Sequence, residues 1–149
     1  MRIYLGADHG GFDLKLQLFE HLTHSGHEVI DVGAKTLDDE DDYPKYAYDL
    51  TTKLIAEEND TAAGVLICRS GQGMAIAANR VRGIRAALAW DRDSAQHARE
   101  DDDANVLVLP ADYVSEDEAF AMVDAWLAAK FKADPKYHRR LDEITDIYG

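Results

Sequence analysis

Cysteine is almost absent from the chain, whose 149 residues include a single one, Cys68. A single cysteine excludes an internal disulfide framework and is typical of a protein from a reducing compartment. A chain of this length can bury roughly 70% of its unfolded surface, so one core can form without a disulfide or a metal. We therefore expect residues 1–149 to form a single domain.

Basic residues are also scarce: 16 lysines and arginines stand against 29 aspartates and glutamates, for a net charge of −13. Sequence-independent binding to nucleic acid or to an anionic membrane depends on clustered basic side chains, so we exclude both partners. A small anion can still bind locally, at a helix N-terminus beside a few placed cations. The sequence shows neither a membrane-spanning segment nor a signal or transit peptide, so we expect a cytoplasmic protein.

Five short apolar runs, rich in valine, isoleucine and leucine, alternate with segments of helical periodicity. They cover residues 2–6, 28–32, 64–68, 84–89 and 106–109. None alternates cleanly with polar residues, which is typical of strands buried on both faces of a parallel sheet. Strands that alternate with helices predict a doubly wound α/β sandwich with right-handed crossovers.

The segments between the runs carry helix signals. Pro44 suits the first turn of the second helix, and Ser115 to Glu118 form a capping box before the fifth. The apolar positions expected to face the core are Phe12, Leu16, Phe19 and Leu22 in the first helix, Ala47, Leu50 and Leu54 in the second, and Ala119, Met122, Val123, Trp126 and Leu127 in the fifth. A last helix over about 135–147 follows no strand, so we expect it to reach a second subunit. Two acidic runs, 38–42 and 100–103, are interpreted as solvated segments.

Polar residues follow the first and third predicted strands, and ligands of open parallel sheets bind outside the carboxyl ends of strands. Asp8 and His9 follow the first strand, and the glycine loop 71–73 follows the third and opens a helix. The amides of such a loop can converge on an anion, although the same residues also suit a plain tight turn. The loop is not a dinucleotide fingerprint, because Ile76 occupies the third glycine position, and it is not a Walker loop.

Cys68 is the candidate reactive group at this edge. A lone cysteine at a strand end is often only a small buried side chain. Here, however, Arg69 and a helix N-terminus follow directly, and both favour a thiolate. A cysteine phosphatase would need an arginine where Met74 stands. The spacing of His, Asp and Glu predicts no metal cluster, so we expect neither a metal nor a cofactor.

Taken in order, these segments resemble a known family. Six segments in order carry the resemblance: Gly6-Ala7-Asp8-His9-Gly10-Gly11, Asp42-Tyr43-Pro44, Ile67-Cys68-Arg69-Ser70-Gly71-Gln72-Gly73, Ala77-Ala78-Asn79-Arg80, Gly83-Ile84-Arg85-Ala86 and Asn105-Val106-Leu107. They are similar to those of the ribose-5-phosphate isomerase B and galactose-6-phosphate isomerase family. The match spans nearly the whole chain. It implies a Rossmann-like five-stranded parallel sheet, a homodimer with active sites shared between subunits, and metal-free aldose–ketose isomerisation of a phosphorylated sugar.

The resemblance also implies roles for single residues. Cys68 corresponds to the base that moves a proton through an enediolate, Ser70 helps to move a proton between oxygens, and the amides near Gly71 and Gly73 hold the enediolate. The substrate-binding residues are then Asp8 and Tyr43 at sugar hydroxyls, His9 at the phosphate, Lys136 and Arg140 at the phosphate from the partner subunit, and, in addition, Arg69 and Asp102.

The chain departs from the family pattern before and after the fifth strand. The family has His-Asn-Asp where Asp101, Asp102 and Asp103 stand, and its histidine opens the furanose ring. Either Asp101 takes over as a catalytic acid, held by His97 one turn earlier, or the substrate needs no ring opening. An arginine that contacts phosphate in the family is also missing, and the segment ends in Asp112.

The sequence therefore predicts an isomerase of ribose 5-phosphate and ribulose 5-phosphate. Three alternatives stay open: an isomerase of another or acyclic sugar phosphate (a tetrose or hexose phosphate), a sugar-phosphate-binding protein without turnover, and a flavodoxin-like signalling or nucleotide module. Cys68 and Ser70 argue against the last two, because a binder needs no thiol base. The sequence also leaves open whether dimers pair into tetramers.

Overall fold

The computed structural model describes residues 1–58 and 61–149, and this part of the chain contains a five-stranded parallel sheet. The strand order is β2-β1-β3-β5-β4. The strands are β1 (Arg2–Ala7), β2 (Glu28–Asp31), β3 (Ala62–Cys68), β4 (Ala86–Leu88) and β5 (Val106–Pro110). Each coincides with a predicted apolar run, so the predicted parallel sheet is confirmed.

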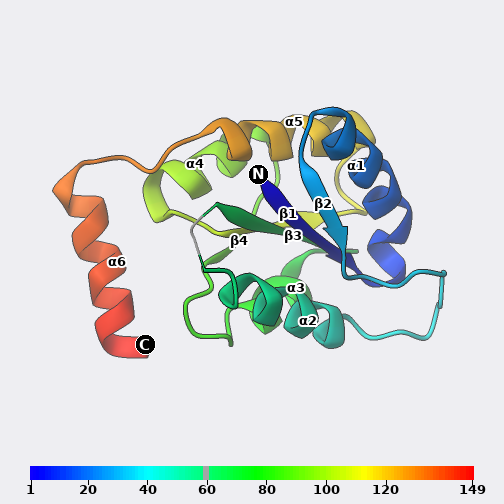
Figure 1. The fold of residues 1–149 in the computed structure, drawn as a ribbon, viewed down its shortest axis with the longest axis horizontal. Coiled ribbons are helices and arrows are strands. Elements are labelled where there is room, and N and C mark those ends of the chain that lie inside the picture. Colours follow the sequence, from blue (N-terminus) through cyan, green and yellow to red (C-terminus); the bar gives the residue numbers. More distant parts are fainter. Residues whose placement is uncertain (59–60) are drawn as a thin grey trace.

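Helices cover both faces of the sheet (Figure 1). They are η1 (His9–Gly11, a 3-10 turn), α1 (Phe12–His24), α2 (Tyr43–Ile55), α3 (Gln72–Ala78), α4 (Arg92–Asp102), α5 (Glu116–Ala128) and α6 (Pro135–Tyr148). α1, α4 and α5 lie on one face and α2 and α3 on the other, and a separate apolar cluster fills each space between helices and sheet. The predicted capping box at Ser115 is present, and Pro44 lies in the first turn of α2.

The buried face of α1 differs from the prediction. Leu14, Leu18 and Leu22 face the core, whereas Leu16 is 47% exposed. The buried face also includes Lys15, whose ammonium pairs with Asp31. The prediction is confirmed for Leu22 and for Phe19, which packs against the core, and is wrong for Leu16; the charged Lys15 on the inward face breaks the apolar periodicity.

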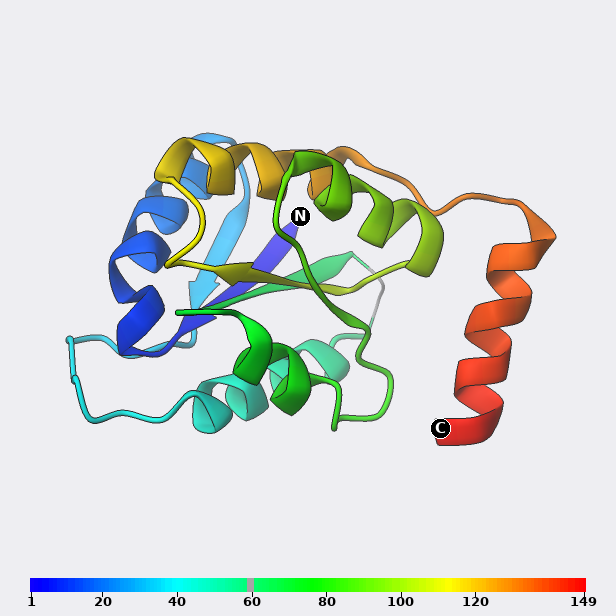
Figure 2. The same ribbon diagram turned by 180° about the vertical axis from the view of Figure 1, so that it is seen from behind.

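α6 lies at the periphery of the molecule, at the end of an extended segment, and contacts the end of α4 (Figure 2). No residue of this helix is buried in the described part of the chain, and Ile147 and Tyr148 are among its exposed apolar side chains. Across residues 1–58 and 61–149, no helix combines the length and the apolar character that crossing a bilayer requires.

The chain leaves β1 toward one side of the sheet and β3 toward the other. β1 and β3 are adjacent in the strand order, yet β2 lies beyond β1 and both β5 and β4 lie beyond β3. Such a switch point leaves a crevice between the two carboxyl ends, and it is where open α/β sheets bind their ligands.

Candidate active site

The ends of β1 and β3 bring the first two predicted motifs together. Ala7 pairs with Ile67 in the parallel register, so Asp8 and Cys68 leave the sheet side by side. The turn η1 packs closely on β3, because a Cβ at Gly11 would lie 2.6 Å from the Ile67 side chain. The predicted grouping of these residues at the carboxyl edge is therefore confirmed.

Cys68 ends β3, belongs to the buried cluster between the sheet and the helices α2 and α3, and is 5% exposed. Burial raises the pKa of its thiol, and this effect outweighs the backbone N–H groups of Met74, Gly71 and Ser70, which act in the opposite direction. The prediction that the surroundings favour a thiolate is wrong, because burial outweighs the helix N-terminus. Because the pKa of the thiol is raised, only a small fraction of it is ionised near neutral pH. The thiolate that does form is a strong base.

The glycine loop after Cys68 has the conformation that an anion-binding turn requires. Gly71 has a φ of 75°, in the left-handed region, and it is the N-cap of α3. A Cβ at this position would lie 2.4 Å from a methyl group of Leu88. The Ser70 hydroxyl accepts a hydrogen bond from the N–H of Gln72 at 3.4 Å, so it lies beside the first turn of α3.

Arg69 does not lie against the thiol as predicted. Its Nη1 is 3.5 Å from Oδ2 of Asp112, and its side chain packs where a Cβ of Gly10 would be. The backbone N–H of Asp112 also donates to the carbonyl of Arg69 at 2.9 Å. Arg69 therefore shares its charge with the acidic residue that follows β5.

His9 has an unpredicted partner, Asp41. Oδ1 of Asp41 accepts a hydrogen bond from the His9 backbone N–H at 2.9 Å and lies 2.8 Å from the ring Nδ1. The Tyr46 hydroxyl donates to Oδ2 of Asp41 at 3.0 Å. The interpretation of run 38–42 as solvated is thus wrong for Asp41, because its carboxylate packs against the residues that follow β1. Local sequence carries no signal for a contact 32 residues away.

The electrostatics of this group follow from these contacts. The hydrogen bond to Asp41 raises the pKa of His9. Burial alone would raise the pKa of Asp41, but its hydrogen bonds with His9 and Tyr46 lower it overall. Burial raises the pKa of Asp8, whose Oδ1 accepts from the N–H of Gly10 at 2.9 Å. His9 is thereby favoured in its charged form, beside two carboxyl groups.

Asp8, His9 and Asp41 also bring three donor atoms within 4.8 Å of one another, which sequence spacing did not suggest. His9 Nδ1 and Asp41 Oδ1 contact each other directly. The arrangement is thus satisfied by protein groups, and we assign no metal to it.

Tyr43 lies over Gly73 at this carboxyl edge, whereas Asp101, Asp102, Lys136 and Arg140 lie toward the opposite edge of the sheet. α4 runs back toward the start of β5, where Val106 pairs with Gly64, while Cys68 pairs with Pro110 four residues further along. At about 3.3 Å per residue, these positions are roughly 13 Å apart along the strands. The sequence suggests Asp101 as a catalytic acid beside Cys68, but within one chain the two lie at opposite edges, because a helix that follows a strand returns to the amino edge.

Asp101 and Asp102 belong to a second cluster, between the end of α4 and α6. Asp101 lies 2.6 Å from Nζ of Lys132 and 3.7 Å from Nδ1 of His97. The predicted neighbour His97 is confirmed, whereas Lys132 was missed. The hydrogen bond from Lys132 lowers the pKa of Asp101, so this carboxylate is ionised and poorly suited to act as an acid. Burial raises the pKa of Asp102.

Lys136 and Arg140 complete the second cluster. Together with Lys132, they approach the ring of Tyr137 within 5.0 to 5.7 Å. Nζ of Lys136 also lies 3.5 Å from Asp134. The second cluster thus combines the carboxylates at the end of α4 with cations at and before the start of α6.

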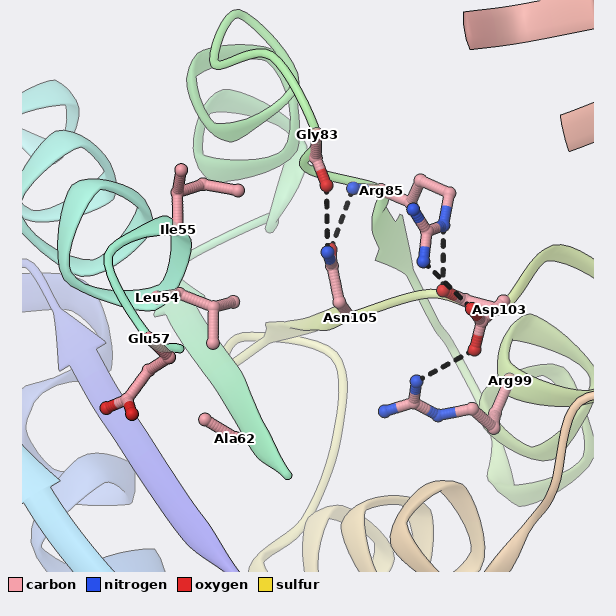
Figure 3. Close-up of a pocket in the computed structure, with 9 residues that line it drawn as sticks. All are labelled: Leu54, Ile55, Glu57, Ala62, Gly83, Arg85, Arg99, Asp103 and Asn105. Carbon is pink, nitrogen blue, oxygen red and sulfur yellow. Dashed lines mark hydrogen bonds and ion pairs between the residues drawn. The ribbon is translucent and has the colours of Figure 1, made fainter. Parts of the chain in front are cut away.

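A cavity of about 390 Å³ also opens at the amino edge (Figure 3). Three of its charged groups pair with one another, since Asp103 lies 2.9 Å from Nη2 of Arg85 and 3.1 Å from Nη1 of Arg99, and Glu57 pairs with Arg2 outside the lining. The first two of these ion pairs join Arg85, just before β4, and Arg99 of α4 to Asp103, which follows α4, and they show that the acidic run 100–103 is only partly solvated. No predicted site residue lines this cavity.

Comparisons with known proteins agree in one family. Residues 3–144 match the model of the family described as Ribose/Galactose Isomerase. The chain is 40% identical over 146 residues to ribose-5-phosphate isomerase B of Mycolicibacterium paratuberculosis, covering 98% of this chain and 91% of that protein. A solved structure of the Thermotoga maritima ribose 5-phosphate isomerase has a TM-score of 0.91 at 39% identity, covering 97% of each chain. That of Mycoplasma genitalium ribose-5-phosphate isomerase B, with bound ribulose-5-phosphate, has a TM-score of 0.93 at 37% identity, covering 98% of this chain and 95% of that one.

Proposed function

Because the chain belongs to the ribose/galactose isomerase family, we propose that it interconverts ribose 5-phosphate and ribulose 5-phosphate. The observation that carries this proposal is the position of Cys68, buried at the switch point of the sheet between Asp8 and the N-terminus of α3. Its free thiol must stay reduced to work as a base, which favours a cytoplasmic location.

The chemistry needs one base that moves a proton between adjacent carbons. The Cys68 thiolate removes the proton from C2 of the aldose, and the electron pair forms an enediolate. The same thiol returns the proton to C1, while the Ser70 hydroxyl carries the hydroxyl proton from O2 to O1. The Cys68 thiolate is thus regenerated at the end of each turnover, and the enzyme gains or loses no net proton or charge.

The N-terminus of α3 supplies the electrostatic stabilisation. Backbone N–H groups of Gly71 and Met74 act on the sulfur and favour the thiolate as it forms. The N–H groups near Gly71 and Gly73 stabilise the negative charge on the enediolate oxygen. Asp8 and Tyr43 hold the sugar hydroxyls, and His9 holds the phosphate.

A second copy of the chain completes the site in this proposal. Lys136 and Arg140 lie at the edge opposite Cys68, so they can reach a substrate on Cys68 only from a partner. The unburied helix α6 supports such a homodimer, because its apolar side chains have no core of their own to join. Arg69 and Asp102 line the two halves of this shared site.

The test is conversion of ribose 5-phosphate to ribulose 5-phosphate, with exchange of the C2 proton into deuterated water. Galactose 6-phosphate and allose 6-phosphate serve as comparison substrates. We expect turnover and exchange with the pentose phosphate, and loss of both in Cys68→Ala. Binding of the sugar phosphate without exchange would instead identify a protein that only binds its ligand.

A further inference from the structure

We infer that Asp41 is a positioning residue for His9: it holds the imidazole by Nδ1 and so leaves Nε2 as the nitrogen that binds the substrate phosphate. This inference rests on the proposed function, because it concerns the phosphate of that same substrate. Neither the acidic run 38–42 nor Asp41 had a role in the chemistry derived above.

The geometry of Asp41 is that of a clamp. One carboxylate oxygen contacts both the backbone N–H and the ring Nδ1 of His9, at 2.9 and 2.8 Å. The other oxygen accepts from the Tyr46 hydroxyl at 3.0 Å, which ties the carboxylate to α2. These contacts fix both the backbone and the ring of His9.

Asp41 differs from the rest of its acidic run. Its side chain is 7% exposed, whereas Asp38, Asp39, Glu40 and Asp42 are exposed. A carboxylate is removed from water at a substantial cost unless hydrogen bonds replace the lost hydration. Three hydrogen-bonding contacts do so here, which is expected of a placed group and not of a solvated loop residue.

The clamp determines what Nε2 can do. A carboxylate only accepts hydrogen bonds, so Nδ1 carries a proton in both charge states of the ring. Nε2 is therefore a donor when the ring is charged and an acceptor when it is neutral. Within residues 1–58 and 61–149 Nε2 has no hydrogen-bond partner. Phosphate oxygens accept hydrogen bonds, so only the charged ring can hold a phosphate.

The surrounding charges favour that charged state. Asp41 and Asp8 both raise the pKa of His9. Tyr46 and Asp38 lie behind Asp41, and Arg69 packs over the neighbouring Gly10. One guanidinium nitrogen of Arg69 lies 3.5 Å from Asp112, and the charged His9 ring offers its Nε2–H as a further donor to an anion.

The sign of the pH dependence follows. Because the pKa of His9 is raised, phosphate binding is strong below that pKa and is lost as the pH rises through it. Replacing Asp41 by asparagine removes the charge that favours the imidazolium. The loss of binding in Asp41→Asn then begins at a lower pH than in the parent.

The direct test is the imidazole titration of His9 in uniformly labelled protein, followed by nitrogen–proton NMR with EDTA present. The His9 signal is assigned with His9→Gln. We expect Nδ1 to stay protonated throughout in the parent, and His9 to titrate at a lower pH in Asp41→Asn. An unchanged titration overturns the inference, whether or not the chain turns over ribose 5-phosphate.

Kinetics and binding test the consequence for the phosphate. For Asp41→Asn near pH 7.5 we expect KM for ribose 5-phosphate, and the inhibition constant of inorganic phosphate, to rise about ten-fold, as for loss of a charge-assisted hydrogen bond. kcat should change by less than about two-fold. Asp39→Asn, the same charge change at an exposed position, should match the parent, and Tyr46→Phe should give a smaller effect in the same direction. A fall in kcat alone, with both constants unchanged, overturns the assignment of Nε2 to the phosphate.

Discussion

The ring of Tyr43 lies directly over Gly73: a Cβ at position 73 would come within 2.7 Å of the ring. This contact joins the first turn of α2 to the first turn of α3. It also explains why two motifs that are distant in the sequence, 42–44 and 71–73, belong to one site.

Gly73→Ala should displace the Tyr43 ring from the loop after Cys68. Alanine is favourable in a helix by about 1 kcal/mol, so the loss should appear in function more than in stability. We expect kcat/KM for ribose 5-phosphate to fall about ten-fold, in line with a misplaced binding group. Ile76→Ala, at an exposed position of the same helix, is the matched control. Parental kinetics in Gly73→Ala would mean that Tyr43 does not contact the substrate.

Cys68 should behave as a thiol of raised pKa. Because Cys68 is the only cysteine, thiolate absorbance near 240 nm reports on it alone. Burial raises its pKa, so the thiolate fraction and the rate of alkylation by iodoacetamide should both rise with pH into the alkaline range. A rate that levels off near neutral pH would contradict this expectation.

Cys68→Ala should lose at least ~100-fold in turnover while the fold survives.

The strands and the carboxyl-edge site could be predicted because each rests on local sequence. An apolar run such as 64–68 indicates a buried strand, and residues that follow such strands must lie at one edge of the sheet. The partners of His9 and Asp101 could not be predicted, because Asp41 and Lys132 approach from segments about thirty residues away. Asp101 is separated from Cys68 because α4 runs antiparallel to the strands, so its C-terminal end lies at the amino edge of the sheet.

Lys15 and Asp31 form an ion pair at the base of the loop that carries Asp41. The Lys15 side chain is 1% exposed, and its Nζ lies 2.9 Å from Oδ2 of Asp31. Asp31→Ala leaves a buried charge without its partner, which should lower the free energy of unfolding by about 3–5 kcal/mol. Urea denaturation measures this loss. Lys35→Ala removes an exposed lysine from the same carboxylate and should cost less than about 1 kcal/mol.

The double variant Lys15→Met with Asp31→Ala separates the missing partner from the missing packing. It removes both charges, so it should be more stable than Asp31→Ala alone. If the double variant is instead the less stable of the two, the unpaired charge of Lys15 is not the source of the loss.

α6 should be needed for dimerisation and for phosphate binding but not for folding. No residue of α6 is buried in the described chain, so truncation after Ala133 should lower the helical circular dichroism signal only by the share of α6 and leave the cooperative unfolding of the core intact. The truncated chain should sediment as a monomer and bind inorganic phosphate weakly, because Lys136 and Arg140 are lost. A monomeric full-length chain would contradict the shared site.

Asp101 bears on which sugar phosphates are turned over fastest. Lys132 holds Asp101 in its ionised form, so Asp101 has no proton to give to a furanose ring oxygen. A tetrose 4-phosphate has no hydroxyl left to close a five-membered ring and reaches Cys68 as an open chain. We therefore expect ring opening to limit turnover of ribose 5-phosphate, and kcat with erythrose 4-phosphate to exceed it.

Asp101→His tests this limit, because a histidine can deliver a proton near neutral pH. The variant should raise kcat with ribose 5-phosphate toward the tetrose value and leave the tetrose rate unchanged, since only the cyclic substrate needs the added step. Asp101→Ala controls for loss of the Lys132 ion pair without gain of an acid. If the parent turns over both substrates equally fast, and neither variant changes the pentose rate, ring opening is not limited by the residue at position 101. The proton must then come from another group of the shared site, and His97, whose Nδ1 lies 3.7 Å from Asp101, is the candidate on the same helix.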